Sequence, residues 1–247
     1  MDLLVSAAAS YAGAVRPVNE DRVVNRSPVF LVADGISGCQ QGELASGLVA
    51  DYFEALAQRT DLTPEIVADA VMDVHDRVRQ SQHDDGHRSA TTLAAVVALW
   101  MGEVPYWMIT NSGDSRVYRV SGAQRRLVTV TEDHTHAQGL LSLGALTTEE
   151  AACHPQRHVL TQAVGSADHF DPDFWLVPII AGEQLLLCTD GLLGETDLVQ
   201  WSAIVTRRDP PEETAAQLVS LALDAGAKDN ISVVVVDVAQ RRPRGHD

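Results

Sequence analysis

Cysteines and long apolar runs are both scarce in this sequence. The three cysteines among 247 residues, Cys39, Cys153 and Cys188, have neither the pattern of a disulfide framework nor the spacing of a zinc ribbon. No uninterrupted apolar run approaches the roughly 18 residues of a membrane span, and no signal sequence precedes the first apolar residues. We therefore expect a cytoplasmic protein without a membrane partner.

Basic residues are also few. The 18 lysines and arginines face 34 aspartates and glutamates, which gives a formal net charge of −16. Binding to nucleic acid or to an anionic membrane needs clustered positive charge, so neither is expected as a partner. A metal cation or a basic protein fits the charge better, although an acidic surface that only promotes solubility explains the same excess.

Short runs rich in β-branched and aromatic residues, bounded by turn signals, predict strands. The runs lie at 29–34, 92–100, 106–110, 116–120, 127–131, 185–188 and 231–238. Consecutive strands joined by short links, as at 92–110, favour antiparallel pairing over a doubly wound parallel sheet.

Three segments carry an apolar stripe with helical period. The first covers 42–59, the second begins at Thr63-Pro64 and runs to 78, and the third begins at Asp209-Pro210 and ends near Gly226. One apolar face on each suits packing on a sheet. We find no internal repeat or linker, and predict one domain over 1–239 with a polar tail at 240–247.

Four aspartates stand at the ends of predicted strands. Asp34 and Asp190 follow apolar strands and precede glycine, Asp229 precedes the strand at 231–238, and Asp114 lies in a turn between two strands. A single Asp-Gly is most simply a turn, because both residues are common after strands. Four such acids in similar settings predict convergence on one edge of a sheet.

Carboxylates that share a cleft repel one another unless a cation neutralises them. Mg²⁺ and Mn²⁺ prefer oxygen ligands, whereas the nine histidines show no zinc-protease spacing, and His134 and His136 are expected in a loop. A glycine after each acid lets the backbone turn sharply beside a ligand. In "RPVNED", Arg16 with Glu20 and Asp21 is either a charged surface turn or a phosphate-binding guanidinium backed by two acids.

The order of short motifs resembles one family, the metal-dependent protein phosphatases of type 2C, in their bacterial serine/threonine form. The matching pieces are "RPVNED", "VADGISG", "GELAS", "SATTLAAVV", "NSGDSRVYR", "TEDHT", "HPQRHVLTQAVG", "LLLCTDGL" and "DNISVVVV". They extend from about residue 16 to 236. The resemblance implies an α+β fold, an α-β-β-α sandwich of two antiparallel sheets flanked by helices, with a mobile flap at about 134–157.

The resemblance also implies a centre of two Mn²⁺ or Mg²⁺ ions with a third, more weakly bound ion. Asp34 would bridge both metals, Gly35 would offer its carbonyl, Asp190 and Asp229 would bind one metal, and Asp114 the third. Arg16 would bind the substrate phosphate. Glu20 and Asp21 would act through metal-bound waters. A water activated by the two metals would hydrolyse phosphoserine and phosphothreonine in proteins, and no cysteine nucleophile is needed.

The sequence departs from the family pattern at four positions. Ile36 stands where animal members have a histidine proposed as general acid, Ser37 and Cys39 replace a glycine and a histidine of bacterial members, and Gln162 replaces an arginine. None of these positions is an implied metal ligand, so we expect an active enzyme whose leaving group is protonated by water or by another group.

Two other hypotheses remain open. A phosphatase-like domain without activity would bind a phosphoprotein, but its mark would be a broken ligand set, and Asp34, Asp190 and Asp229 are all present. A phosphoacceptor receiver domain also ends a strand in Asp, but its topology alternates strands and helices. We expect a monomer that acts on proteins phosphorylated by a serine/threonine kinase.

Overall fold

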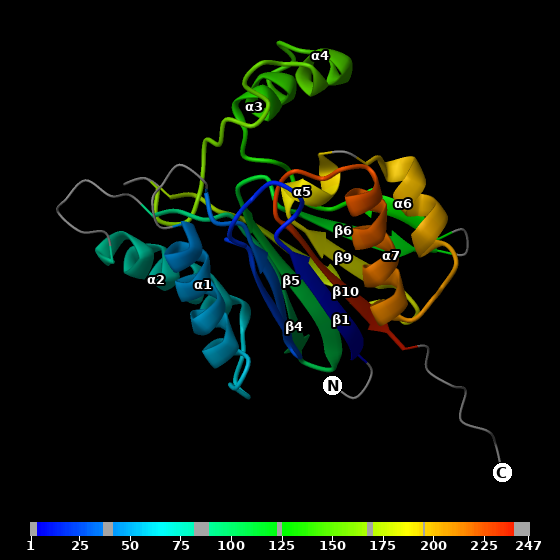
Figure 1. The fold of residues 1–247 in the computed structure, drawn as a ribbon. Coiled ribbons are helices and arrows are strands. Elements are labelled where there is room, and N and C mark those ends of the chain that lie inside the picture. The colour runs from blue at the N-terminus through cyan, green and yellow to red at the C-terminus, as the bar shows by residue number, and fades with distance from the viewer. Residues whose placement is uncertain are drawn as a thin grey trace.

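The computed structural model describes residues 4–36, 42–81, 89–122, 125–166, 170–194 and 196–239. Two five-stranded antiparallel sheets face each other, with helices on the two outer sides (Figure 1). The first sheet runs in the order β1 (Leu4–Tyr11), β10 (Ile231–Val238), β9 (Gln184–Cys188), β6 (Arg116–Ser121) and β7 (Arg126–Thr129). The second runs β2 (Arg22–Arg26), β3 (Val29–Ala33), β4 (Leu93–Met101), β5 (Val104–Ser112) and β8 (Asp173–Pro178). The predicted α-β-β-α sandwich is confirmed.

The interior strands are apolar on both faces because each sheet is covered on both sides. Every residue of β3 and β9 is buried, as are seven of the eight residues of β10. One set of side chains fills the space between the sheets, where Phe30, Trp107, Leu187 and Val234 are fully buried. Strands buried in this way read as continuous hydrophobic runs, so the sequence marks them clearly.

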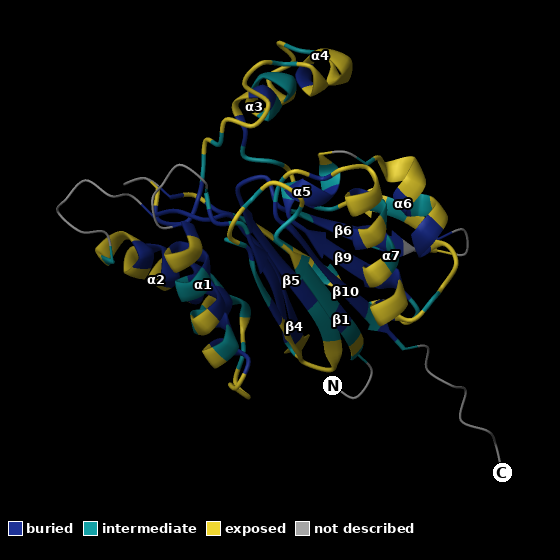
Figure 2. Cartoon of the chain, in the orientation of Figure 1, coloured by how far each residue is buried: buried dark blue, intermediate teal, exposed yellow. Residues whose placement is uncertain are grey.

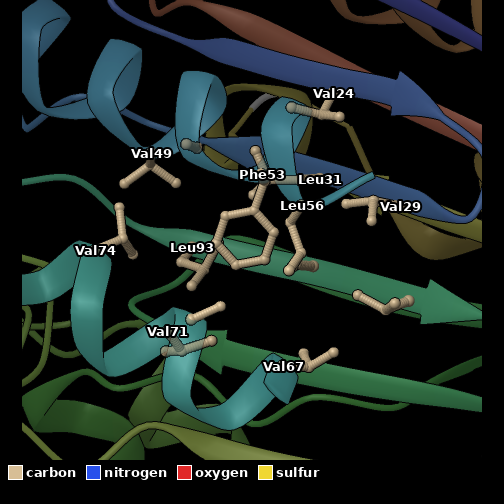
Figure 3. Packing of buried hydrophobic residues seen from close by; sticks show 14 of the residues in the cluster. Val24, Val29, Leu31, Val49, Phe53, Leu56, Val67, Val71, Val74 and Leu93 are labelled. Carbon is tan, nitrogen blue, oxygen red and sulfur yellow. The ribbon is translucent and has the colours of Figure 1, made fainter. Parts of the chain in front are cut away.

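Two helices cover the outer face of the second sheet. They are α1 (Gly42–Leu56) and α2 (Pro64–Gln80), whose N-cap Thr63 accepts a hydrogen bond from the Ile66 amide as expected. Their apolar faces meet the sheet in the cluster that surrounds Phe53 and Leu93 (Figure 3). Burying a side chain of this size contributes about 2 kcal/mol.

The outer face of the first sheet carries three helices: α5 (Asp190–Leu193), α6 (Leu198–Val205) and α7 (Pro211–Asp224). The third predicted helix begins one residue later than an N-cap at Asp209 implied. Pro210 occupies the N-cap and Pro211 the first turn, because the fixed φ of proline suits the first helical position. Gly226, with φ +84°, ends this helix as predicted.

Two short helices, α3 (His136–Ser142) and α4 (Thr148–Ala152), project from one end of the sandwich (Figure 1). Most of their residues are exposed, in contrast to the buried strands below them (Figure 2). The chain enters and leaves this projection through a bridge between Thr135 and Leu160. The projection coincides with the flap expected at about 134–157. Among the described residues, no helix is long and apolar enough to cross a membrane.

Candidate metal centre

Strand ends from both sheets bring the predicted acids to the same end of the sandwich, below the flap. Asp34 follows β3, Asp114 lies in the turn from β5 to β6, Asp190 follows β9, and Asp229 precedes β10. The carboxyl groups of Asp34 and Asp190 lie close enough to shift each other's pKa. The acids predicted from separate parts of the sequence therefore lie in one cluster.

Burial and mutual repulsion raise the pKa values in this cluster. Burial raises the pKa of Asp114 to about 8, with the negative charge of Asp190 adding to the effect. The pKa of Asp34 lies well above its ordinary value, first because the group is buried and then because Asp21 and Asp190 are close. Burial also raises the pKa of Asp190. A divalent cation would offset the repulsion among these carboxylates and favour their ionised form, so the cluster is a suitable set of oxygen donors for such an ion.

Asp34 is held by two threonines of the "SATT" segment. Its amide donates to Thr92 Oγ1 at 2.9 Å, and its carbonyl accepts from the Thr91 hydroxyl at 2.8 Å and from the Thr92 amide at 2.9 Å. The Thr92 hydroxyl lies 2.6 Å from that of Ser115, which follows Asp114. One side chain thus links the loops that carry Asp34 and Asp114. The sequence motif was visible, but its spacing gave no sign of this role.

The glycines after Asp34 and Asp190 allow a neighbouring backbone segment to pack closely against them, and they do not form a left-handed turn. Neither Gly35 nor Gly191 has a positive φ. A Cβ on Gly191 would lie 1.9 Å from the Asn230 carbonyl oxygen, and one on Gly35 would lie 2.5 Å from the Gly42 backbone. The expectation of a sharp turn after Asp190 is wrong, because Asp190 and Gly191 begin α5.

The "RPVNED" segment lies over the same end of the sheets, but its arginine does not stand free. Arg16 Nε and Nη2 donate to the two carboxylate oxygens of Asp229 at 2.8 and 2.7 Å. Both side chains are about 40% exposed. The guanidinium that was predicted to bind phosphate therefore pairs here with a predicted metal ligand.

Glu20 and Asp21 differ in their surroundings. The Glu20 amide donates to Asn230 Oδ1 at 2.9 Å, and the Asn230 amide group in turn donates to the carbonyls of Ala12 and Val18. Asp21 is buried and accepts from the Thr189 hydroxyl at 2.9 Å, and burial raises its pKa to about 7. Asn230 and Thr189, neither of them singled out from the sequence, therefore fix the segment against Asp229 and Asp190.

His158 joins the cluster from the flap side. One ligand atom each from Asp114, His158 and Asp190 lies within 4.8 Å of the others. Sequence reasoning missed this residue, although it lies in the quoted motif "HPQRHVLTQAVG", because a lone histidine carries no ligand spacing. Two of the four positions that depart from the family pattern, Ser37 and Cys39, lie outside the described residues.

A pocket of about 620 Å³ opens between the acids and the flap. Its walls come from the flap residues Ala137, Leu141 and Ala151 and from the sheet end with Asp190 and Asp229. The pocket joins a polar, acidic floor to a partly apolar roof. Such a site suits a charged group on an extended segment better than a small apolar ligand.

Comparison with known proteins identifies the family. Residues 18–224 match the family model described as Protein phosphatase 2C. Over 236 residues the chain is 32% identical to protein phosphatase PhpP of Streptococcus pneumoniae, covering 92% of this chain and 94% of the relative. It is 35% identical over 241 residues to the serine/threonine protein phosphatase PstP of Mycobacterium tuberculosis, covering 94% of this chain and 44% of that protein.

Solved structures agree with the sequence relatives. The PPM Ser-Thr phosphatase MsPP of Mycobacterium smegmatis, in complex with cacodylate, matches with a TM-score of 0.85 at 33% identity, covering 95% of this chain and 98% of that one. The catalytic domain of the serine threonine protein phosphatase PstP in complex with two manganese ions matches with a TM-score of 0.79 at 30% identity, covering 96% and 99%. The chain therefore belongs to the protein phosphatase 2C family.

Proposed function

We propose that the carboxylate cluster of this protein holds two divalent cations and that the protein uses them to hydrolyse phosphoserine and phosphothreonine in other proteins. The chain is a metal-dependent protein serine/threonine phosphatase, the activity of its family and of its relatives. The observation that carries the assignment of the site is the convergence of Asp34, Asp190 and Asp229 at one end of the sandwich, with raised pKa values at Asp34 and Asp190.

The residues present fit a pair of Mn²⁺ or Mg²⁺ ions. Asp34, the carbonyl of Gly35, Asp190 and Asp229 would hold the two ions, since hard cations favour oxygen donors. When bound, the ions would supply a water of lowered pKa and positive charge beside the phosphoryl oxygens. Asp21 and Glu20 would position the ordered waters around the ions, and burial of Asp21 keeps its carboxyl in one orientation.

Arg16 is the candidate phosphate-binding group. Its planar fork already holds a carboxylate bidentately in Asp229, and the same geometry suits two oxygens of a phosphate. Asp229 is the guanidinium's partner in this structure. Because the pair is about 40% exposed, a change of partner needs no unfolding of the loop that carries Arg16.

A third cation site is proposed at Asp114, with His158 and Asp190 as its other donors. The ligand atoms of these residues lie within 4.8 Å of one another. His158 stands at the stem of the flap, so this site would join the flap to the sheet end. An imidazole donor makes Mn²⁺ the better fit than Mg²⁺ at this third position.

We further propose that the protein acts in the cytoplasm as a monomer, on substrates of a serine/threonine kinase in a signalling pathway. The sparse cysteines support a reducing compartment. A receiver domain is excluded, because the two sheets are antiparallel throughout. A silent phosphatase-like domain is not favoured, because the predicted ligands lie together at one end of the sandwich.

The decisive experiment measures release of phosphate from a phosphothreonine peptide and from p-nitrophenyl phosphate, with Mn²⁺ and with a chelator. We expect activity only with the ion, and a loss of at least about 10³-fold in Asp34→Asn and Asp190→Asn, since each removes a ligand charge. Asp61→Asn, an exposed acid after α1, is the control for loss of charge and stays active. Turnover that survives the chelator would overturn the mechanism.

A further inference from the structure

An arginine lies beside the proposed third cation site, where its charge opposes cation binding. Arg116 begins β6, two residues after Asp114, and lines the same pocket as Asp114, His158 and Asp190. A guanidinium this close to a cation site would raise the free energy of the bound ion, because like charges repel strongly in a partly buried pocket.

Asp133 holds this guanidinium. Arg116 Nε donates to Asp133 Oδ1 at 2.7 Å and Nη2 donates to Oδ2 at 2.6 Å, while Nη1 donates to the Tyr118 hydroxyl at 3.2 Å. The side chains are 30% and 14% exposed, so solvent screens the pair only in part. A bidentate pair of this kind is among the strongest and most directional contacts a protein makes.

The pair is not what attaches the flap to the sandwich. Other bonds tie the residues beside Asp133 to the end of β5 and to the turn that follows it. The His134 amide donates to the Gly113 carbonyl in the turn at 2.9 Å, and Nδ2 of Asn111 in β5 donates to the Glu132 carbonyl at 3.1 Å. His134 also pairs with Asp173 on β8 at 3.1 Å. Removing the carboxylate of Asp133 should therefore leave the base of the flap in place.

We propose that Asp133 is a positioning residue for the third cation: it cancels the charge of Arg116 and keeps its guanidinium off Asp114 and Asp190. The balance between Arg116 and Asp133 then sets the affinity of the third site. The two ions at Asp34, Asp190 and Asp229 share only Asp190 with that site and should respond much less. The inference rests on the proposed function, because it takes the third site as a cation site.

The experiment is a calorimetric titration of the full chain with Mn²⁺, which reports binding without reference to activity. Asp133→Asn leaves an unpaired cation and should weaken the third ion about tenfold, equivalent to about 1.4 kcal/mol. Arg116→Gln leaves an unpaired carboxylate in the same pocket and should tighten the third ion by a similar factor. The double variant should return to within about threefold of the wild type.

A matched ion pair elsewhere provides the control. Arg59 donates to both oxygens of Asp61 at 2.9 and 2.7 Å, the same bidentate arrangement in the loop after α1. Asp61→Asn should change neither the number of ions bound nor their affinities. The first two ions share only Asp190 with the third site, so their affinities should change by less than about threefold in every variant, which also shows that the fold survives.

Opposite shifts in the two single variants are what distinguish charge balance from a structural role. Weakening of the third ion by both single variants, or by neither, would overturn the proposal. A wild-type protein that binds two ions only would overturn it as well, together with the third site. Hydrolysis of p-nitrophenyl phosphate by the wild type in Mn²⁺ tests the proposed function separately, since it needs only the first two ions.

Discussion

The sheet end that carries the acids and the flap above it are built in opposite ways. At the sheet end, contacts link residues far apart in the chain, as when Thr189 donates to Asp21 and Asn230 accepts from Glu20. In the flap, the contacts are local: Thr135 and Thr147 cap their own helices, and Leu143 is 83% exposed. One region depends on the whole fold for its geometry, and the other depends on its own short segment.

The two regions differ because they need different degrees of geometric precision. Charged ligands for two cations must be held at fixed spacing, and only long-range packing provides that. A surface that meets many protein segments gains from being free to adjust, and local helices with few buried side chains permit it. Substitutions at the sheet end should therefore have larger effects than equivalent substitutions in the flap.

A methyl group at Gly191 should disrupt the sheet end, while the same change in the flap should be harmless. The Cβ of Gly191→Ala would lie 1.9 Å from the Asn230 carbonyl oxygen, so the two backbone segments must separate. We expect a loss of about 3 kcal/mol or more in the free energy of unfolding, measured in urea, and loss of activity. Gly139 in α3 has no atom within 4 Å of its Cβ position, so Gly139→Ala should stabilise by up to about 1 kcal/mol. Equal changes in the free energy of unfolding for Gly191→Ala and Gly139→Ala would contradict the difference between the sheet end and the flap.

The metal-free protein should lose stability as pH rises, because the raised pKa values belong to the sheet end. Asp21 and Asp114 titrate at about 7 and about 8 in the folded protein, above their ordinary value of 3.8. Between pH 4 and these folded-state pKa values the folded state binds more protons than the unfolded state, so the stability that these two groups contribute is full below pH 4 and is lost as pH rises through 8. We expect the Tm in chelator to drop by roughly 5 °C between pH 6 and 8, and excess Mn²⁺ to cancel the drop. A Tm that rises over this interval would contradict the account.

Removal of the Arg16 guanidinium should affect substrate binding far more than stability. Its pair with Asp229 is about 40% exposed on both sides, and pairs of this kind contribute less than about 1 kcal/mol to folding. Arg16→Ala should lower kcat/KM for a phosphopeptide about 10- to 100-fold, with Arg16→Lys intermediate because it keeps charge without the fork. The check is steady-state kinetics beside a urea melt of each variant. An Arg16→Ala variant that loses stability but keeps its kcat/KM would contradict the assignment of Arg16 to phosphate binding.

The smallest effect is expected at a flap cap. Thr147 and Glu150 form reciprocal hydrogen bonds at the start of α4. Thr147→Ala should weaken α4 locally by about 1 kcal/mol, visible as faster amide exchange over 148–152. Global unfolding and hydrolysis of p-nitrophenyl phosphate should stay unchanged, since the two hydrogen bonds described for the cap join Thr147 and Glu150 to each other. A shift in global stability would show that the flap is part of the core.

The acids at the sheet end were predictable from the sequence, even though their geometry depends on contacts between residues far apart in the chain. Asp34, Asp190 and Asp229 are recognisable because each lies next to the end of an apolar run, and a run buried on both faces has a strong signal. The long helices α1, α2 and α7 are recognisable by their apolar stripes. These are local patterns, and they locate the acids without any knowledge of which strands pair.

The supporting contacts were not predictable, because they join distant positions through ordinary residues. Thr92 meets Ser115 across 23 positions and Thr189 meets Asp21 across 168, and nothing local marks a threonine for such a role. The edge strands β1, β2 and β8 were not predicted either: β1 is rich in alanine and serine, and β2 and β8 are short and only partly buried. The pairing of Arg16 with Asp229 was not predictable either, because it depends on how the loop that carries Arg16 folds.

The position of the acids at the ends of β9 and β10 bears on turnover. These two strands pair with each other in the middle of a five-stranded sheet and are almost wholly buried, so they separate only when the whole protein unfolds. The flap's helices are capped by their own segments, so a change in the flap should leave that ladder undisturbed. Cations bound at these strand ends, as proposed, would therefore stay in place from one turnover to the next.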